Sequence, residues 1–380
     1  MQPIYDVLVI GGGQAGLAAG YHLTRAGLSF AILEGAAAPG GSWPHYYDSL
    51  RLFSPAGRSS LPGMPFPNQA QHYPARDEVV AYLQAYARHF DLPVITGAAV
   101  ARVERTTPGF HVLTTAGEIY QSRALIAATG AFHRPYAPEL PGQDVFAGRV
   151  LHAAAYRNAT SFAGQRVVMV GAGNSAIQIG VELAKVARVT LATREPIRFR
   201  RQKLLGQDIH HWAWLLGLDR LPIGVFAANA SATGVLDTGV YRAAVLAGQP
   251  DRRPMFTHFT PTGIVWADGT EEPVDAVIYA TGYRPNLDYL ADLGALDADG
   301  RPAHRRGIST TVLRLAYVGL SNQWTYASAT LRGVGPDAAY VVGYLRRDLR
   351  AAMNTVSERG HANRRRFGVW RCCAGKEGAV

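Results

Sequence analysis

The chain has 380 residues, of which 48% are hydrophobic and 17% charged, enough to form two globular domains. No apolar run reaches the roughly 20 residues of a membrane-spanning helix, so neither a membrane partner nor a signal segment is expected. The formal net charge is +10, but residues 346–380 hold nine Lys/Arg against three Asp/Glu, a surplus of +6. The rest of the chain therefore carries about +4, which excludes an evident nucleic-acid surface and suits an enzyme of anionic cofactors.

The only cysteines are the adjacent pair Cys372 and Cys373. Vicinal cysteines rarely form a structural disulfide, and two alone cannot cage a metal ion. A reducing, cytoplasmic compartment is therefore expected. The segment that holds them, residues 361–380, is basic and is expected to be a disordered tail.

The first predicted elements are a buried strand, a glycine turn, a helix and a second strand within residues 5–34. Gly11, Gly13 and Gly16 form the pattern G-x-G-x-x-G, in which the glycines permit a tight turn, close approach of a pyrophosphate and close helix packing. The pyrophosphate would lie at the helix N-terminus, beside Gln14 and Ala15. Glu34 ends the second strand, where a carboxylate can accept hydrogen bonds from ribose hydroxyls. This unit predicts a dinucleotide site.

The next informative stretch is GGSWPHYYDSLRLFSP, residues 40–55. It is expected to be a loop that wraps the bound cofactor, although Trp43 could instead be a core aromatic beneath a loop. The residues of this loop that we expect to contact the cofactor are Gly41, Ser42, Trp43, Arg51, Leu52 and Phe53.

A second glycine turn follows in QRVVMVGAGNSAIQIGVELAKVARVTLATRE, where Gly171, Gly173 and Ala176 give G-x-G-x-x-A. Asn174 and Ser175 would flank its pyrophosphate. The spacing that places Glu34 after the first turn places Arg194 after the second. An arginine can pair with a 2′-phosphate and Glu34 would repel one, so the second site is predicted to prefer NADPH.

Two neighbouring residues could also contact the nucleotide at the second site. Thr193 could add a hydroxyl contact to the nucleotide. Alternatively Arg194 is a surface residue and Glu195 holds the ribose of NADH.

Two further stretches repeat one another, each ending in an apolar strand and A-T-G. The turns Thr129–Gly130 and Thr281–Gly282 are therefore expected to be equivalent and to lie near a cofactor or a domain crossing. The repetition predicts an α/β fold of two Rossmann-like domains, one inserted in the other. We place an FAD-binding domain at 1–152 and 284–360 and an NAD(P)H-binding domain at 153–283.

Several single residues have alternative roles. Arg198, Arg200, Arg201 and Lys203 either bind phosphate or form a solvated basic loop. His210 and His211 lack partners at ligand spacing, so no metal site is predicted. Trp212 and Trp214 are expected in the core or at a domain interface, and Gln323 beside the cofactor ring.

The stretch FAGRVLHAAAYR, residues 146–157, reads F-x-G-x-x-x-H-x-x-x-Y followed by Arg157. It resembles the identifying sequence of class B flavin monooxygenases, and the chain as a whole is most similar to the short bacterial flavin-containing monooxygenases. The resemblance implies that NADPH reduces FAD, that O₂ adds to the flavin C4a, and that the hydroperoxyflavin oxygenates a small-molecule substrate. No catalytic acid or base is predicted.

The resemblance also carries expectations about particular residues. His152 would order the linker and support bound NADP⁺, or else be a packing histidine. The ending Tyr156–Arg157 is similar to that of members that oxygenate sulfides and amines, with small ketones as a further substrate class. Phe53 lies where many members carry an asparagine, which predicts some release of hydrogen peroxide.

Two other functions stay open at this point. The chain could be an NAD(P)H oxidase or flavin reductase that passes electrons to a partner. It could also be a non-catalytic protein that binds both cofactors. A homodimer is the expected assembly.

Overall fold

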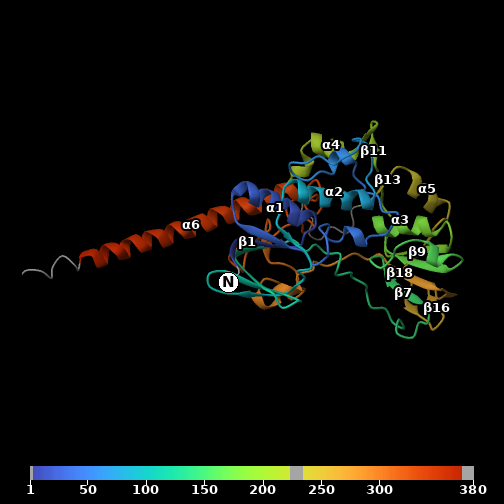
Figure 1. Ribbon diagram of the computed structural model, residues 1–380. Helices are drawn as coiled ribbons and strands as arrows, with labels where there is room; N and C mark the ends of the chain where they lie inside the picture. Colours follow the sequence, from blue (N-terminus) through green and yellow to red (C-terminus); the bar gives the residue numbers. More distant parts are fainter. Residues whose placement is uncertain (1–2, 223–233, 370–380) are drawn as a thin grey trace, which may run out of the picture.

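The computed structural model describes residues 3–222 and 234–369, with side chains described as far as residue 352. Figure 1 shows two lobes, each built around its own sheet, and a long helix that projects from the first lobe.

The first lobe holds a sheet in the order β19-β20-β21-β6-β1-β2-β3. Its centre is parallel, because β1 pairs with β2 and β6, and β21 pairs with β6, all in the same direction. The antiparallel pair β4–β5 is attached to β6. The strands are β1 (Ile4–Ile10), β2 (Phe30–Leu33), β3 (Val94–Ile95), β4 (Val100–Arg105), β5 (Phe110–Thr114), β6 (Ile119–Ala127), β19 (His304–Arg305), β20 (Ile308–Ser309) and β21 (Leu315–Tyr317).

Helices cover one face of this sheet, and apolar side chains of the strands are buried on both faces. Val7, Val9 and Ile126 point to the face covered by helices, and Leu8 and Leu125 point to the other, all fully buried. Strands with both faces buried are typical of a parallel sheet. The helices of this lobe are α1 (Gln14–Ala26), α2 (Arg76–His89) and α6 (Val334–Val369), with short 3₁₀ turns η1 (Trp43–His45), η2 (Ala56–Arg58) and η6 (Asp288–Leu293).

The second lobe holds a parallel sheet in the order β14-β9-β8-β18-β7. Its two faces also have separate buried clusters. The strands of this lobe are β7 (Arg149–His152), β8 (Arg166–Val170), β9 (Arg188–Thr193), β10 (Phe199–Arg201), β11 (Lys203–Leu204), β12 (Gln207–Asp208), β13 (Val235–Asp237), β14 (Asp251–Pro254), β15 (His258–Phe259), β16 (Gly263–Val265), β17 (Glu271–Pro273) and β18 (Ala276–Tyr279). Its helices are α3 (Asn174–Leu183), α4 (Ile209–Leu215) and α5 (Val240–Leu246), with η3 (Thr160–Phe162) and η4 (Leu218–Arg220).

The α/β class with two Rossmann-like units is confirmed. The strands of the second sheet all lie in sequence between β6 and β19, so the second unit interrupts the first. The expected boundary after His152 falls one strand too late, because β7 pairs in parallel with β18 and so belongs to the second sheet. A short strand at a sheet edge has too little apolar pattern to reveal its sheet from sequence.

The C-terminal helix also differs from the expectation. A disordered tail was predicted from residue 361, but α6 continues to Val369. The rest of the predicted tail, residues 370–380 with Cys372 and Cys373, lies outside the described residues. Among the described helices, none is both long and apolar enough to cross a bilayer.

Candidate cofactor and active site

The turn after β1 is built as the first glycine motif predicts. Gly11 has φ +107°, and a Cβ there would lie 2.6 Å from the Ala128 carbonyl oxygen, so no larger residue fits. A Cβ on Gly16 would lie 1.8 Å from the Gly11 carbonyl oxygen, which shows how closely α1 packs on the turn. Helix α1 begins directly after Gly13, so its free N–H groups point at the space beyond the turn.

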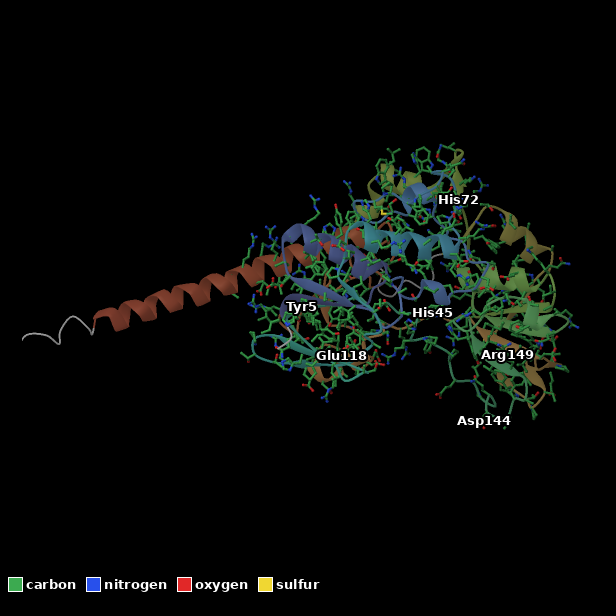
Figure 2. The ribbon with its side chains drawn as sticks, viewed as in Figure 1. Tyr5, His45, His72, Glu118, Asp144 and Arg149 are labelled. Carbon is green, nitrogen blue, oxygen red and sulfur yellow. The ribbon has the colours of Figure 1, made fainter. Side chains whose placement is uncertain are left out.

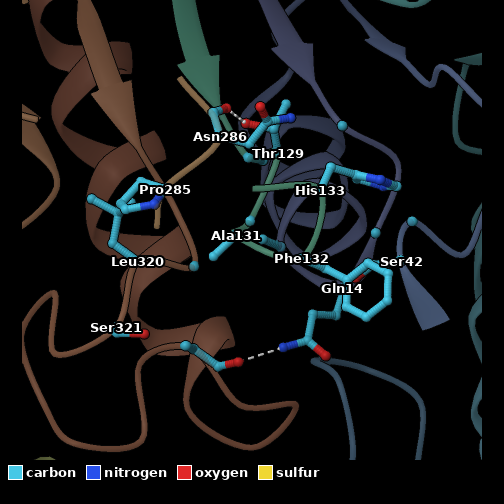
Figure 3. Close-up of a pocket in the computed structure, with 18 of the residues that line it drawn as sticks. Gln14, Ser42, Thr129, Ala131, Phe132, His133, Pro285, Asn286, Leu320 and Ser321 are labelled. Carbon is cyan, nitrogen blue, oxygen red and sulfur yellow. Dashed lines mark hydrogen bonds between the residues drawn. The ribbon is translucent and has the colours of Figure 1, made fainter. Parts of the chain in front are cut away.

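That space is the main cavity, of about 1450 Å³, at the carboxyl ends of β1, β2 and β6. Figure 3 shows part of its wall, where residues from the first glycine turn, the segment after β6 and the loop after β21 surround one space. The predicted residues that line it are Gly11, Gly13, Gln14, Ala15, Glu34, Gly41, Ser42, Trp43, Leu52, Phe53, Thr129, Gly130 and Gln323.

Glu34 is fixed at one end of the main cavity. It is almost fully buried, and its two carboxylate oxygens accept hydrogen bonds from the backbone N–H groups of Gly12, at 2.7 Å, and Ala36, at 2.8 Å. Each oxygen keeps a second lone pair. The carboxylate is thereby oriented toward the cavity, where a ribose hydroxyl could donate to it.

Gln14 connects three separate segments around the cavity. Its amide nitrogen donates to the Ala329 carbonyl oxygen at 2.6 Å, as Figure 3 shows, and its amide oxygen accepts from Trp43 Nε1 at 3.1 Å. Trp43 is therefore held by the glycine turn and lines the cavity as well as packing against the core.

Gln323 offers an unused donor to the same cavity. Its side chain is 2% exposed, and its oxygen accepts from the Leu320 N–H at 3.3 Å. Its Nε2 atom is buried and has no hydrogen-bond partner among the described residues. A buried amide without a partner costs stability, so this nitrogen fits an acceptor supplied by a ligand ring.

Burial shifts the pKa of several ionisable groups of the main cavity toward their neutral forms. Burial lowers the pKa of His133, with a smaller effect of nearby His45, and burial also lowers the pKa of His304. Burial raises the pKa of the Tyr46 and Tyr283 hydroxyls. Glu34 is the only carboxylate among the described residues that line the cavity.

The second glycine turn repeats the geometry of the first. Gly171 has φ +139°, and a Cβ there would lie 2.5 Å from the Ala280 carbonyl oxygen, as Gly11 faces Ala128. Helix α3 begins after Gly173, with Asn174 and Ser175 in its first turn. This turn is not part of the main cavity.

The end of β9 carries the predicted residues Thr193 and Arg194. Thr193 is buried, and its hydroxyl accepts a hydrogen bond from Arg252 Nε at 2.8 Å, so it faces β14 rather than solvent. Arg194 is exposed, without an ion pair to any described residue. Sequence reasoning missed Arg252, because only the pairing of β14 with β9 brings it here.

His152 and Arg51 do not reach the main cavity. The His152 ring meets Tyr283 edge-on at 5.0 Å, its Nδ1 accepts from the Ala154 N–H at 3.0 Å, and burial lowers its pKa. Arg51 is exposed and donates to the Tyr73 carbonyl oxygen. His152 therefore touches the cavity only through Tyr283, which lines it.

The two A-T-G turns also differ in position. Thr129 donates to the Asn286 carbonyl oxygen at 2.5 Å and lines the main cavity. Thr281 and Gly282 do not line it; Thr281 donates to the Tyr136 carbonyl oxygen and Gly282 accepts from the Tyr136 N–H. Thr281 and Gly282 join, through Tyr136, the two chain segments that connect the lobes.

Several cavity residues were not predicted from sequence. They come from loops after the two A-T-G turns and from the loop around η1, and they include His45, Tyr46, Phe132, His133, Tyr283 and Tyr289. In Figure 2, His45 lies on the side of the first lobe that faces the second lobe, whose sheet carries Arg149. The position of AFHRP and GYRP directly after the A-T-G turns is the one sequence signal that could have found some of them.

Comparisons with known proteins agree with this geometry. Residues 8–213 match the family model of the pyridine nucleotide-disulphide oxidoreductases. A flavin-containing monooxygenase from Stenotrophomonas maltophilia is 38% identical in sequence, with a TM-score of 0.81, and the match covers 93% of this chain and all of that one.

Two further relatives are an oxidoreductase and a monooxygenase by name. A CzcO-like uncharacterized oxidoreductase of Geobacillus kaustophilus is 35% identical over 348 residues, covering 90% of this chain and 98% of the relative. An indole-3-pyruvate monooxygenase of Oryza sativa is 31% identical over 329 residues, covering 74% of this chain and 75% of the relative.

The fold and the two glycine turns define a flavin oxidoreductase that uses a pyridine nucleotide. More narrowly, the chain belongs to the flavin-containing monooxygenase family. It is an FAD-dependent NAD(P)H monooxygenase, and FAD and NADPH are the cofactors that the family implies.

Proposed function

We propose that the protein uses NADPH and O₂ to oxygenate soft heteroatoms of small molecules, sulfides and amines first, with small ketones as a secondary class. For a sulfide, NADPH, a proton and O₂ are consumed, one oxygen atom forms the S–O bond, and the other leaves as water. Bound FAD supplies the oxygen-activating chemistry, and the chain supplies binding, orientation and exclusion of water.

The observation that carries this proposal is the composition of the main cavity. Its only described carboxylate, Glu34, is engaged with two backbone N–H groups at the dinucleotide end. A sulfide or tertiary amine provides its own lone pair for oxygen transfer, so no protein base has to deprotonate it. A cavity that orders a ring, and whose only described carboxylate is already engaged, suits that reaction.

The described residues fit FAD in the main cavity. The N-terminus of α1 would hold the pyrophosphate, Glu34 the ribose, and the unpartnered Gln323 Nε2 an acceptor of the flavin ring. Trp43, fixed by Gln14, would cover one side of the bound flavin.

NADPH would bind at the second glycine turn, with its 2′-phosphate between Arg194 and Arg252. Arg252 Nε is bonded to Thr193, which orients the guanidinium beside the end of β9 and leaves its other nitrogens available. Two guanidinium groups at the position that holds a carboxylate in the first unit favour the phosphorylated nucleotide. His152 would act at a distance, by holding Tyr283 and the linker.

The Tyr156–Arg157 ending supports the heteroatom class through the resemblance and contributes to packing here. Tyr156 is buried between Tyr47 and Phe162, and Arg157 donates to the His45 carbonyl oxygen at 2.6 Å. The pair therefore ties the start of the second lobe to a cavity loop and does not touch the substrate space.

Product analysis with substrates of matched size tests the substrate class. The holoenzyme is given NADPH, O₂ and either an alkyl aryl sulfide or an aryl alkyl ketone. We expect sulfoxide to form with at least about tenfold higher kcat/KM than ester. Ester as the faster product would overturn the heteroatom proposal.

A second function, NAD(P)H oxidase, is favoured by one observation. Phe53 lines the main cavity, so an apolar ring stands there in place of a polar amide. The same assay distinguishes an oxidase from a monooxygenase, since an oxidase would consume NADPH and yield hydrogen peroxide without sulfoxide.

A further inference from the structure

Six of the large hydrophobic side chains exposed on the second lobe belong to β11, α4 and the residues that follow them. They form what we call the apolar patch, which consists of Leu204, Leu205, Trp214, Leu215, Leu216 and Leu218. Leu205 is 83% exposed and Leu216 is 66% exposed. Figure 1 places α4 and β11 together at one edge of the molecule, at the top of the view. Contiguous exposed apolar surface marks a site of interaction.

The apolar patch is presented by an ordered framework. Trp212 Nε1 donates to the Leu204 carbonyl oxygen at 2.9 Å, which holds the β11–β12 hairpin against α4. The Arg58 guanidinium lies 3.9 Å from the centre of the Trp214 ring, a cation–π contact. The opposite side of α4 buries His210 and Ala213. Trp214 does not lie in the core, because 52% of it is exposed, and Arg58 of the first lobe covers one side of its ring.

Positive charge accompanies the apolar patch. Arg201, Lys203 and Arg220 are exposed, and none forms an ion pair with any residue in the described part of the chain. The two acids of residues 196–222 are already engaged. Asp208 is buried in hydrogen bonds, and Asp219 accepts from Tyr326 and pairs with Arg332.

We propose that the apolar patch docks on an anionic phospholipid surface. Leucines and a tryptophan would enter the boundary between headgroups and acyl chains, while the three cations meet lipid phosphates. A second copy of the chain fits less well, because a two-fold contact would set these unpaired cations against each other. A nucleic acid would leave the leucines without an apolar partner. Docking of this kind needs no membrane-spanning helix.

The apolar patch is close in sequence to one residue that lines the main cavity. Pro222, four residues after Leu218, lines that cavity. A lipid surface on the patch would therefore deliver apolar substrates beside the site where they are oxygenated. The docking itself does not depend on the proposed reaction.

Vesicle co-sedimentation of the FAD-loaded holoenzyme tests the proposal. We use vesicles of phosphatidylglycerol and phosphatidylcholine in equal parts, and vesicles of phosphatidylcholine alone. Binding is expected to the mixed vesicles, to weaken as salt is added, and to be weaker on phosphatidylcholine alone. Leu205→Glu and Leu216→Glu should each lower binding about tenfold or more.

Leu246→Glu is the matched control, because Leu246 is 76% exposed on α5, away from the patch. It should bind vesicles like the parent chain, and all three variants should keep the parent's unfolding temperature and NADPH turnover in solution. The proposal is overturned if the parent chain does not bind the mixed vesicles at low salt, or if Leu246→Glu loses binding equally. It is also overturned if the patch variants change only the oligomeric state in sedimentation velocity, which would identify a second copy as the occupant.

Discussion

At the residue scale, the choice of nicotinamide cofactor depends on two arginines. Replacing Arg194 or Arg252 by Gln should lower kcat/KM for NADPH about tenfold to a hundredfold each, because each change removes a charge-assisted phosphate contact. The value for NADH should stay unchanged. Steady-state kinetics with both cofactors measures this ratio. Arg198→Gln is the control, since Arg198 is exposed and faces Glu195; a fall in NADH turnover as large as that in NADPH turnover would refute the assignment.

The Phe53 ring is expected to cause release of part of the activated oxygen as hydrogen peroxide. Phe53→Asn should lower the ratio of hydrogen peroxide released to NADPH consumed, because a polar amide would then face the main cavity. Peroxide and NADPH are measured in the same reaction with a sulfide present. An unchanged or higher ratio in the variant would show that Phe53 does not cause the release of hydrogen peroxide.

Individual residues differ in how far the sequence could predict them. Gly11 and Glu34 were predicted because a strand, a turn and a second strand set their positions locally. Arg252 and Tyr283 were missed, since their positions depend on strand pairing and on a return of the chain between the lobes. Arg51 was placed in the site by its neighbours in sequence, yet it lies outside while Leu52 and Phe53 lie inside, because its side chain donates to the Tyr73 carbonyl oxygen.

At the scale of elements, a buried polar network joins the start of α4 to the loop that holds Phe53. Asp208 accepts hydrogen bonds from Tyr73, Gln202 and His210, and Gln202 donates to the Phe53 carbonyl oxygen at 2.5 Å. Burial alone would raise the pKa of the Asp208 carboxyl, but these hydrogen bonds, from His210 first, bring it down to about 2. The network therefore ties the second lobe to one wall of the main cavity.

Asp208→Asn should lower the free energy of unfolding by about 2–4 kcal/mol, because an amide cannot accept from all of its donors. The pKa of this carboxyl falls from 3.8 to about 2 on folding, so its stabilising contribution is complete above pH 3.8 and disappears as the pH drops through 2. The variant should therefore lose less stability over that acid range than the parent does. Denaturant unfolding at several pH values measures both effects.

Asp299→Asn serves as the control for that comparison, because Asp299 is 70% exposed and pairs only loosely with Arg301. It should change the unfolding free energy by less than about 0.5 kcal/mol. If Asp208→Asn were equally harmless, the network would not hold the loop as described.

The connections between the lobes explain why element boundaries were harder to predict than the elements themselves. Residues 131–136 run beside residues 282–286, joined by hydrogen bonds from Tyr136 N–H to Gly282 and from Arg284 N–H to Arg134. Both follow an A-T-G turn, which the sequence showed. Which sheet β7 joins depends on its pairing with β18, and nothing local in its four residues specifies that.

At the scale of the whole molecule, FAD should be part of the folded structure. The main cavity lies at the carboxyl ends of β1, β2 and β6, and the buried Gln323 Nε2 in its wall has no partner among the described residues. Removing FAD should lower the unfolding temperature by about 5 °C or more, and adding FAD back should restore it. Calorimetry of the two forms measures this. Equal unfolding temperatures would mean that FAD contributes nothing to the fold.

The central prediction for the whole molecule is that an oxygen atom from O₂ is transferred to a heteroatom at the main cavity. The most direct test supplies the holoenzyme with NADPH, an alkyl aryl sulfide and oxygen-18 gas, and measures the isotope in each product by mass spectrometry. We expect one labelled oxygen in the sulfoxide, in an amount that corresponds to most of the NADPH consumed. Recovery of the label entirely as hydrogen peroxide, with unlabelled sulfoxide or none, would contradict it.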